Sequence, residues 1–183
     1  MYIDNQGLLQ GAPHQASPHF DDRPANTLID MIVIHGISLP PGEFGQNMVS
    51  PFFCGILDCS LHPYFETIKD LKVSAHLFIS RQGEITQFVP FLKRAWHAGQ
   101  STFAGQTQCN NFSIGIELEG TDEIPYEEPQ YQTLAKIIPL LIQAYPAITP
   151  ERIVGHSDIA PGRKTDPGPA FNWDYLRKLL QQS

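Results

Sequence analysis

The sequence is poor in charged side chains, and those it has are mostly acidic. Asp, Glu, Lys and Arg make up 17% of the 183 residues, and 12 basic against 19 acidic residues give a net charge of −7. Clusters of Lys and Arg, on which nucleic-acid binding and attachment to anionic membranes depend, do not occur. The sequence therefore predicts neither partner, and no pattern in it indicates an obligate protein partner.

Cysteines and long apolar runs are also scarce. The three cysteines, Cys54, Cys59 and Cys109, are an odd number, which does not favour a disulfide framework. Reduced thiols are typical of the cytoplasm. No apolar run reaches the roughly 18–20 residues of a membrane-spanning helix, and the N-terminal residues lack the basic and apolar regions of a secretory signal. We therefore expect a cytoplasmic protein.

Apolar residues, at 42% of the composition, are sufficient for a sizeable core. The length suits a single domain spanning residues 1–183, in which the polar residues 1–26 form an irregular N-terminal arm. Strands and helices alternate along the rest of the chain, which predicts an α/β (α+β) fold with a central mixed β-sheet flanked by helices. Strands are expected within residues 27–35, 75–80, 84–89, 113–118 and 152–155, and helices over residues 62–72, 127–145 (with Pro139 as a kink or local break) and 173–182.

Two histidines follow directly on expected strands. His35 ends the apolar run Met31–Ile34, and His156 follows Ile153-Val154-Gly155. Asp166 comes ten residues after His156, in a segment rich in proline. Zinc hydrolases commonly use three nitrogen or oxygen ligands and keep one position open for water. These three residues are therefore a candidate metal site, although buried structural histidines fit the pattern as well.

Other polar residues near these positions have both functional and ordinary interpretations. Glu117 and Glu119 share one face of an expected strand, where a carboxylate is costly unless it is paired, solvated or functional. Lys164, two residues before Asp166, is suited to stabilising an oxyanion. The alternatives are glutamates that face water at the strand end and an ordinary surface lysine.

A second metal site is also conceivable. Cys54, Cys59 and His62 form a C-x4-C-x2-H cluster, which His76 or Cys109 would complete as a structural zinc site. The alternative is that the thiols are free and partly buried.

Five segments together resemble the zinc-dependent N-acetylmuramoyl-L-alanine amidases. The resemblance extends from about Pro18 to about Trp173, and its motifs occur in the family's order. The segments are VIHGISLPPGEFG, VSAHLFISRQGEITQFVP, RAWHAGQS, NFSIGIELEGT and GHSDIAPGRKTDPGPAFNW. The fold that the resemblance implies is the same mixed sheet with helices on its faces.

The resemblance also implies a role for each candidate residue. His35, His156 and Asp166 match the zinc ligands, Glu117 the general base, and Lys164 the lysine that stabilises the oxyanion. The implied substrates are anhydro-muropeptides, cut between the lactyl group of 1,6-anhydro-N-acetylmuramic acid and the L-Ala of the stem peptide. The implied setting is cytoplasmic recycling of cell-wall fragments, with an indirect effect on β-lactamase induction.

The substrate-binding positions depart in part from the family pattern. Gly36 stands where we expect an asparagine, and Lys72 and Gln108 stand where we expect arginines. Lysine loses the bidentate fork of arginine, and glutamine loses its charge as well. Arg163 matches the pattern.

Two aromatic residues, Trp96 and Tyr64, are further candidates for the substrate groove, although Tyr64 is equally suited to core packing. We expect His76 and His97 to be structural.

Two other kinds of protein compete with an enzyme of muropeptide recycling. One is a non-catalytic module that binds peptidoglycan, which the presence of Asp166, Glu117 and Lys164 disfavours. The other is a secreted amidase or a phage lysin that acts on intact cell wall, which the N-terminal sequence and the LPPGEFG loop disfavour.

Overall fold

The computed structural model describes residues 1–182, which form a central five-stranded sheet in the order β11-β4-β10-β5-β6. The pairs β11–β4, β4–β10 and β10–β5 are parallel, whereas β5–β6 is an antiparallel hairpin. The strands are β4 (Met31–Ile37), β5 (Leu77–Ile79), β6 (Ile85–Gln87), β10 (Ser113–Glu119) and β11 (Ile153–Gly155). The predicted mixed sheet is confirmed.

The two longest strands, β4 and β10, lie side by side in the middle of the sheet. Their β-branched residues suit strands buried on both faces, and all seven residues of β10 are buried. The register pairs Met31 with Ser113 and His35 with Glu117. Because neighbours in register share a face, two polar side chains meet near the carboxyl ends of these strands.

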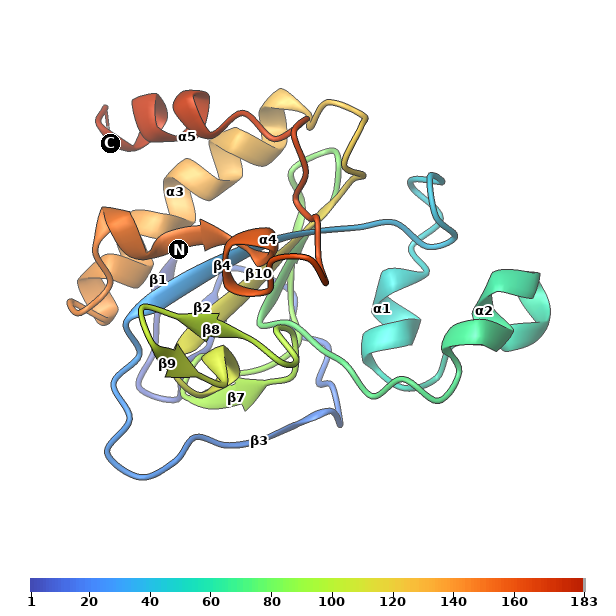
Figure 1. Cartoon of the computed structure of the whole chain (residues 1–183), viewed down its shortest axis with the longest axis horizontal. Helices are drawn as coiled ribbons and strands as arrows, with labels where there is room; N and C mark the ends of the chain where they lie inside the picture. Colours follow the sequence, from blue (N-terminus) through green and yellow to red (C-terminus); the bar gives the residue numbers. More distant parts are fainter. Residues whose placement is uncertain (183) are drawn as a thin grey trace.

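Helices α3 (Glu128–Ala144) and α5 (Trp173–Leu180) pack together and cover one face of the sheet (Figure 1). Alternate residues of the central strands, such as Ile34 and Ile116, join Leu134 and Ile138 of α3 in the main hydrophobic cluster. Helix α3 is continuous through Pro139, so of the expected kink or local break, the break does not occur.

The short helices lie near the carboxyl ends of the parallel strands. Figure 1 shows α1 (Val49–Phe53) and α2 (Pro63–Ile68) beyond the end where β4 leaves the sheet. Helix α4 (His156–Ile159) follows β11 directly. Sequence reasoning missed α1 and α4, which are too short to show a helical period, and it placed the end of α2 four residues too late.

Small paired strands surround this core. They are β1 (Tyr2–Ile3) with β2 (Leu9–Gln10), β3 (Phe20–Asp22) with β7 (Lys93–Ala95), and β8 (Thr102–Phe103) with β9 (Gln106–Thr107). Single 3-10 turns lie at Cys59–Leu61, Cys109–Asn111 and Pro150–Arg152. Residues 1–26 thus contain three short strands and are more regular than we expected.

No helix within residues 1–182 combines the length and the apolar character needed to cross a membrane.

Candidate functional site

Three side chains converge near the carboxyl ends of adjacent parallel strands. His35 lies on β4, His156 follows the neighbouring β11, and Asp166 comes from the loop after α4. The Nδ1 atoms of His35 and His156 are 2.9 Å apart, and the Asp166 Oδ2 atom lies 3.2 Å from the first and 3.1 Å from the second. This edge is the usual ligand-binding place of a parallel sheet.

The loop that carries Asp166 is fixed by its main chain. The Ser157 amide donates to the Asp166 carbonyl over 2.9 Å, and the Tyr126 hydroxyl donates to the Pro167 carbonyl over 3.0 Å. These bonds tie the carboxylate to α4 and to the segment after β10, so its position does not depend on the loop alone.

The three atoms form a donor set that fits a metal ion. The remaining ring nitrogen of each histidine contacts another group, since His35 Nε2 lies 2.9 Å from His97 Nδ1 and His156 Nε2 lies 3.1 Å from the Ala98 carbonyl oxygen. Lone pairs on two nitrogens and one carboxylate oxygen therefore point at one place, where a cation or protons must lie between them. Atoms bound to tetrahedral zinc at about 2.0–2.1 Å are about 3.3 Å apart, close to the spacing here.

Electrostatics favour the same assignment. Burial lowers the pKa of His35 to about 4, although the adjacent Asp166 carboxylate opposes the shift, so this ring is neutral at pH 7. Burial alone would raise the pKa of Asp166, but the adjacent His156 and His35 lower it overall. A neutral imidazole and an ionised carboxylate are the forms that bind metal ions.

Glu117 lies beside this cluster with one oxygen unused. Its Oε1 atom is 4.0 Å from His35 Nδ1, and its Oε2 atom is buried without a hydrogen-bond partner in the described residues. Burial, followed by the negative charge of Asp166, raises the pKa of Glu117 well above its ordinary value. A carboxyl group in this state is suited to exchanging protons with a bound water or substrate.

Glu119, which shares its strand face with Glu117, has a structural role. Its two oxygens accept hydrogen bonds from the main-chain amides of Gly45, at 2.5 Å, and Arg81, at 3.1 Å. Both glutamates are buried. The alternative interpretation, in which they face water at the strand end, is therefore wrong.

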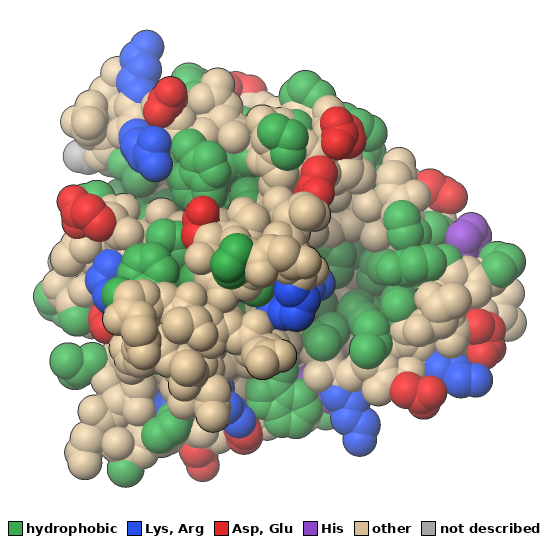
Figure 2. Space-filling view, viewed as in Figure 1, with side chains coloured by type: hydrophobic (Ala, Val, Ile, Leu, Met, Phe, Trp, Pro, Cys, Tyr) green, Lys and Arg blue, Asp and Glu red, His purple; other side chains and the backbone are tan. Residues whose placement is uncertain are grey.

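A cavity of about 350 Å³ opens over the cluster. Glu117, Asp166 and the exposed Lys164 line it. Its other walls are largely apolar, and Figure 2 shows hydrophobic side chains gathered around a hollow on the α1–α2 side of the molecule. The apolar lining includes Leu39, Phe52, Phe53, Ile68, Leu71 and Val73.

Two of the predicted substrate-binding residues, Gly36 and Tyr64, line this cavity. The packing also accounts for the unexpected glycine, because a Cβ atom at position 36 would lie 2.2 Å from the Tyr126 hydroxyl oxygen. The space that an asparagine would need is filled by Tyr126. Sequence reasoning missed this residue, since nothing in its local pattern indicates a contact with Gly36.

The other predicted substrate-binding residues do not line the cavity. Lys72 is exposed beside a neighbouring pocket, and Gln108 is exposed in the turn after β9. The Trp96 indole donates to Asp21 Oδ1, and the Arg163 guanidinium donates to the carbonyls of Ala98 and Gln100. Their roles in substrate binding stay predictions.

The alternative cysteine site does not form. In residues 1–182, the only group of three or more His, Cys, Asp or Glu side chains close enough to hold a metal is His35, His156 and Asp166. All three cysteines are free, and Cys109 is buried.

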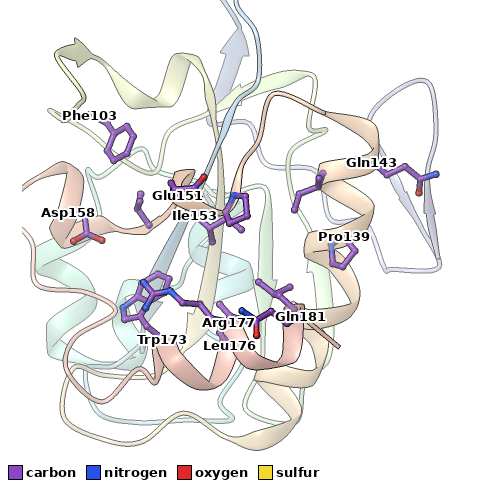
Figure 3. A pocket seen from close by; sticks show the side chains of 14 residues that line it. Phe103, Pro139, Gln143, Glu151, Ile153, Asp158, Trp173, Leu176, Arg177 and Gln181 are labelled. Atoms are coloured by element: carbon purple, nitrogen blue, oxygen red, sulfur yellow. The ribbon is translucent and has the colours of Figure 1, made fainter. Parts of the chain in front are cut away.

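A larger hollow of about 1010 Å³ lies between α3, β11 and α5 (Figure 3). Its floor is apolar, with Ile153, Trp173 and Leu176, and charged side chains such as Glu151 and Arg177 stand at its border. None of the predicted metal-binding or catalytic residues lines it. The predicted catalytic residues Glu117 and Lys164 line the smaller cavity instead.

Comparison with known proteins identifies the family. A family model described as N-acetylmuramoyl-L-alanine amidase matches residues 24–169. The 1,6-anhydro-N-acetylmuramyl-L-alanine amidase AmpD of Escherichia coli (strain K12) is 53% identical over 177 residues, which cover 97% of this chain and 96% of the relative.

Solved structures show the same similarity. A crystal structure of a selenomethionine AmpD derivative superposes with a TM-score of 0.94 at 52% identity, covering 98% of this chain and 99% of the other. The AmiD amidase from E. coli, in complex with the substrate anhydro-N-acetylmuramic acid-L-Ala-D-gamma-Glu-L-Lys, has a TM-score of 0.59 at 32% identity, covering 97% of this chain and 62% of AmiD. The chain belongs to the N-acetylmuramoyl-L-alanine amidase family and is an amidase, as the sequence motifs predicted.

Proposed function

We propose that this amidase is zinc-dependent and hydrolyses the amide bond between the lactyl group of 1,6-anhydro-N-acetylmuramic acid and L-Ala of the stem peptide. The observation that carries the proposal is the convergence of His35, His156 and Asp166 within 3.2 Å, beside the unpartnered oxygen of Glu117. The setting that we propose is cytoplasmic recycling of muropeptides, with its indirect effect on β-lactamase induction.

Two similarities support the substrate class. The relatives with 51–53% identity are named for the 1,6-anhydro sugar, and they match nearly the full chain. AmiD holds an anhydro-muramyl tripeptide as its substrate. The apolar walls of the cavity suit the methyl groups of the lactyl and alanyl parts, which flank the amide that is cut.

Each of these residues has its own role in the reaction. His35, His156 and Asp166 would hold zinc, which polarises a carbonyl and lowers the pKa of water when it is bound. Glu117 accepts a proton from the attacking water as the new C–O bond forms. It returns that proton to the peptide nitrogen as the C–N bond breaks, so the amine leaves neutral.

Lys164 has a separate role. Its ammonium lines the same cavity as Glu117 and Asp166, and within residues 1–182 its side chain makes no hydrogen bond or ion pair. It is therefore free to donate to the oxygen that gains negative charge when water adds to the carbonyl.

The test offers the purified protein anhydro-muropeptide and intact peptidoglycan, each with and without a chelator. Release of peptides that begin with L-Ala is followed by mass spectrometry. We expect turnover of anhydro-muropeptide, its loss with chelator and its return with added zinc. Asp166→Asn should lose bound zinc, while Asp174→Asn, a matched change at an exposed carboxylate of α5, should retain it.

Three results would overturn parts of the proposal. Full activity in protein shown by metal analysis to hold no zinc would refute the metal role. Faster hydrolysis of intact peptidoglycan than of anhydro-muropeptide would refute the substrate class and favour an enzyme that acts on the cell wall. Binding of either substrate without cleavage would contradict the catalytic roles given to Glu117 and Lys164.

A further inference from the structure

A chain of three buried hydrogen bonds extends from the candidate metal site into the protein interior. His35 Nε2 lies 2.9 Å from His97 Nδ1, His97 Nε2 lies 3.2 Å from Ser113 Oγ, and Ser113 Oγ lies 2.6 Å from the Cys109 carbonyl oxygen. We propose that His97, held by Ser113, is a positioning residue that keeps the proton of His35 on Nε2 and so leaves Nδ1 free to bind the metal. This inference rests on the proposed zinc site.

The donor and acceptor of each hydrogen bond follow from the last bond of the series, which ends at the Cys109 carbonyl. The Cys109 carbonyl is only an acceptor, so the single hydroxyl proton of Ser113 is donated to it. Ser113 Oγ must then accept from His97, which places the His97 proton on Nε2. A neutral His97 therefore has a free Nδ1 and accepts from His35 Nε2. Because the proton of His35 is on Nε2, its Nδ1 atom carries a lone pair that is free to bind a metal.

The surroundings of His97 favour its neutral form. Its side chain is buried, and in the described part of the chain its two ring nitrogens contact only His35 and Ser113. The rings of His35 and His76 stand at 5.0 and 5.8 Å from it, centroid to centroid. Burial without a carboxylate partner disfavours an imidazolium ion.

Strand β10 is shaped to hold this ring. Ser113, Gly115 and Glu117 alternate along the strand and so lie on one face of it. A Cβ atom at Gly115 would lie 2.4 Å from the His97 ring, so only glycine leaves room for the imidazole. One face of β10 therefore supplies the anchor of His97, the space for its ring and the candidate catalytic carboxylate.

The residue after His97 fixes the other histidine in the same way. The Ala98 carbonyl is only an acceptor, so His156 Nε2, 3.1 Å away, must carry a proton and leave Nδ1 free. Asn110 Oδ1 accepts from the main-chain amides of both His97 and Ala98, at 3.2 and 2.8 Å. Residues 97–98 thus orient both rings, one through a side chain and one through the backbone.

The first measurement needs no metal. Long-range ¹H–¹⁵N spectra of the imidazoles, recorded with a chelator present, report which nitrogen of His35 carries the proton. We expect Nε2–H in the parent protein and a mixture of both forms in His97→Phe, which has no acceptor. His97→Gln, whose amide has both an acceptor and a donor, should restore the Nε2–H form. A parent protein with the proton on Nδ1 would refute the inference, whether or not it binds zinc.

The second measurement is zinc affinity, by competition with a chelator of known Kd. Loss of an outer-shell partner typically weakens metal binding by roughly 10- to 100-fold, and we expect this loss in His97→Phe. Ser113→Ala should weaken zinc several-fold, and His97→Gln should stay near the parent. Thr133→Ala removes another buried hydroxyl that donates to a carbonyl, that of Gly83, and serves as the control for stability alone.

The two failures are distinguishable. Parent-like zinc affinity in His97→Phe, or in Ser113→Ala if the first variant does not fold, would overturn the positioning role while zinc binding by the parent stands. A parent that binds no zinc would instead refute the proposed metal site, and the spectra of His35 would then decide the tautomer by themselves.

Discussion

At the scale of single residues, Glu117 has an energetically unfavourable placement. A buried carboxyl group with an unpartnered oxygen is costly to the fold, and Glu117 sits in a strand whose every residue is buried. Glu119, two residues later, satisfies both oxygens with main-chain amides. The contrast indicates that the free oxygen of Glu117 binds a partner from outside the chain, such as water or substrate.

Replacing Glu117 by glutamine removes the proton acceptor and keeps the shape of the side chain. We expect Glu117→Gln to bind zinc normally and to lower kcat by roughly 10²–10⁴-fold, the range for loss of a general base. Steady-state kinetics and metal analysis check this result.

Glu84→Gln, a matched change at an exposed residue of the β5–β6 turn, should leave kcat unchanged. A kcat of Glu117→Gln within a factor of three of the parent would remove Glu117 from this role.

At the scale of elements, the site depends on how the ends of strands and loops pack. Gly36 on β4 and Gly120 after β10 leave space for the Tyr126 side chain. A Cβ atom at Gly36 would lie 2.2 Å from its hydroxyl oxygen, and one at Gly120 would lie 2.3 Å from its ring. The Tyr126 hydroxyl reaches the Pro167 carbonyl, next to Asp166. A contact between three separate segments therefore positions Asp166, a predicted metal-binding residue.

The pair of Gly36 and Tyr126 makes a testable double mutant. Gly36→Ala forces its Cβ against the hydroxyl oxygen and should cost about 1–3 kcal/mol of unfolding free energy, as overpacking does. Tyr126→Phe removes that oxygen, after which the nearest atom to the new Cβ is at 3.5 Å. The double variant should therefore be more stable than the sum of the two single effects predicts.

Urea unfolding of the parent and the three variants measures this coupling. Additive effects, within about 0.5 kcal/mol, would mean that Tyr126 does not limit the side chain at position 36.

At the scale of the whole molecule, buried histidines make stability depend on pH. Burial, followed by the positive charge of Arg23, lowers the pKa of His76 to about 3. Its Nδ1 accepts from the Gly115 amide and its Nε2 donates to the Lys93 carbonyl. His76 is thus the structural residue that the sequence led us to expect.

This shift predicts the sign of a pH effect. Between about pH 6.5 and about pH 3, His76 binds a proton in the unfolded chain and not in the native one, so stability falls as pH falls. One such proton contributes at most about 1.4 kcal/mol per pH unit. His76→Gln should flatten the slope of unfolding free energy against pH by up to this amount.

The measurement is urea unfolding at several pH values between 7 and 4.5, with a chelator present so that metal binding does not contribute. His62→Gln is the control, because that ring is only partly buried. Equal slopes for His76→Gln and the parent would show that His76 titrates alike in both states.

Much of the fold was predictable because local patterns report burial. The β-branched run of Met31–Ile34 and the alternation of residues 113–118 predict strands, and both are present. The spacing of apolar residues predicts α3. Helices α1 and α4 were missed because 5 and 4 residues are too few to show a period. The ordered motifs were sufficient for the family, since residue types at fixed spacings carry that information.

Tertiary structure alone decided how the site is assembled. His35 and His156 are 121 residues apart, and only the parallel pairing of β4 with β11 places their Nδ1 atoms 2.9 Å from each other. The same holds for His97, which appeared in the sequence as one histidine among seven and which packing places behind His35. Sequence patterns show which residues are buried, but strand register and loop packing set which side chains meet. That is why the sequence could indicate the candidate metal-binding residues but not the hydrogen bonds that orient them.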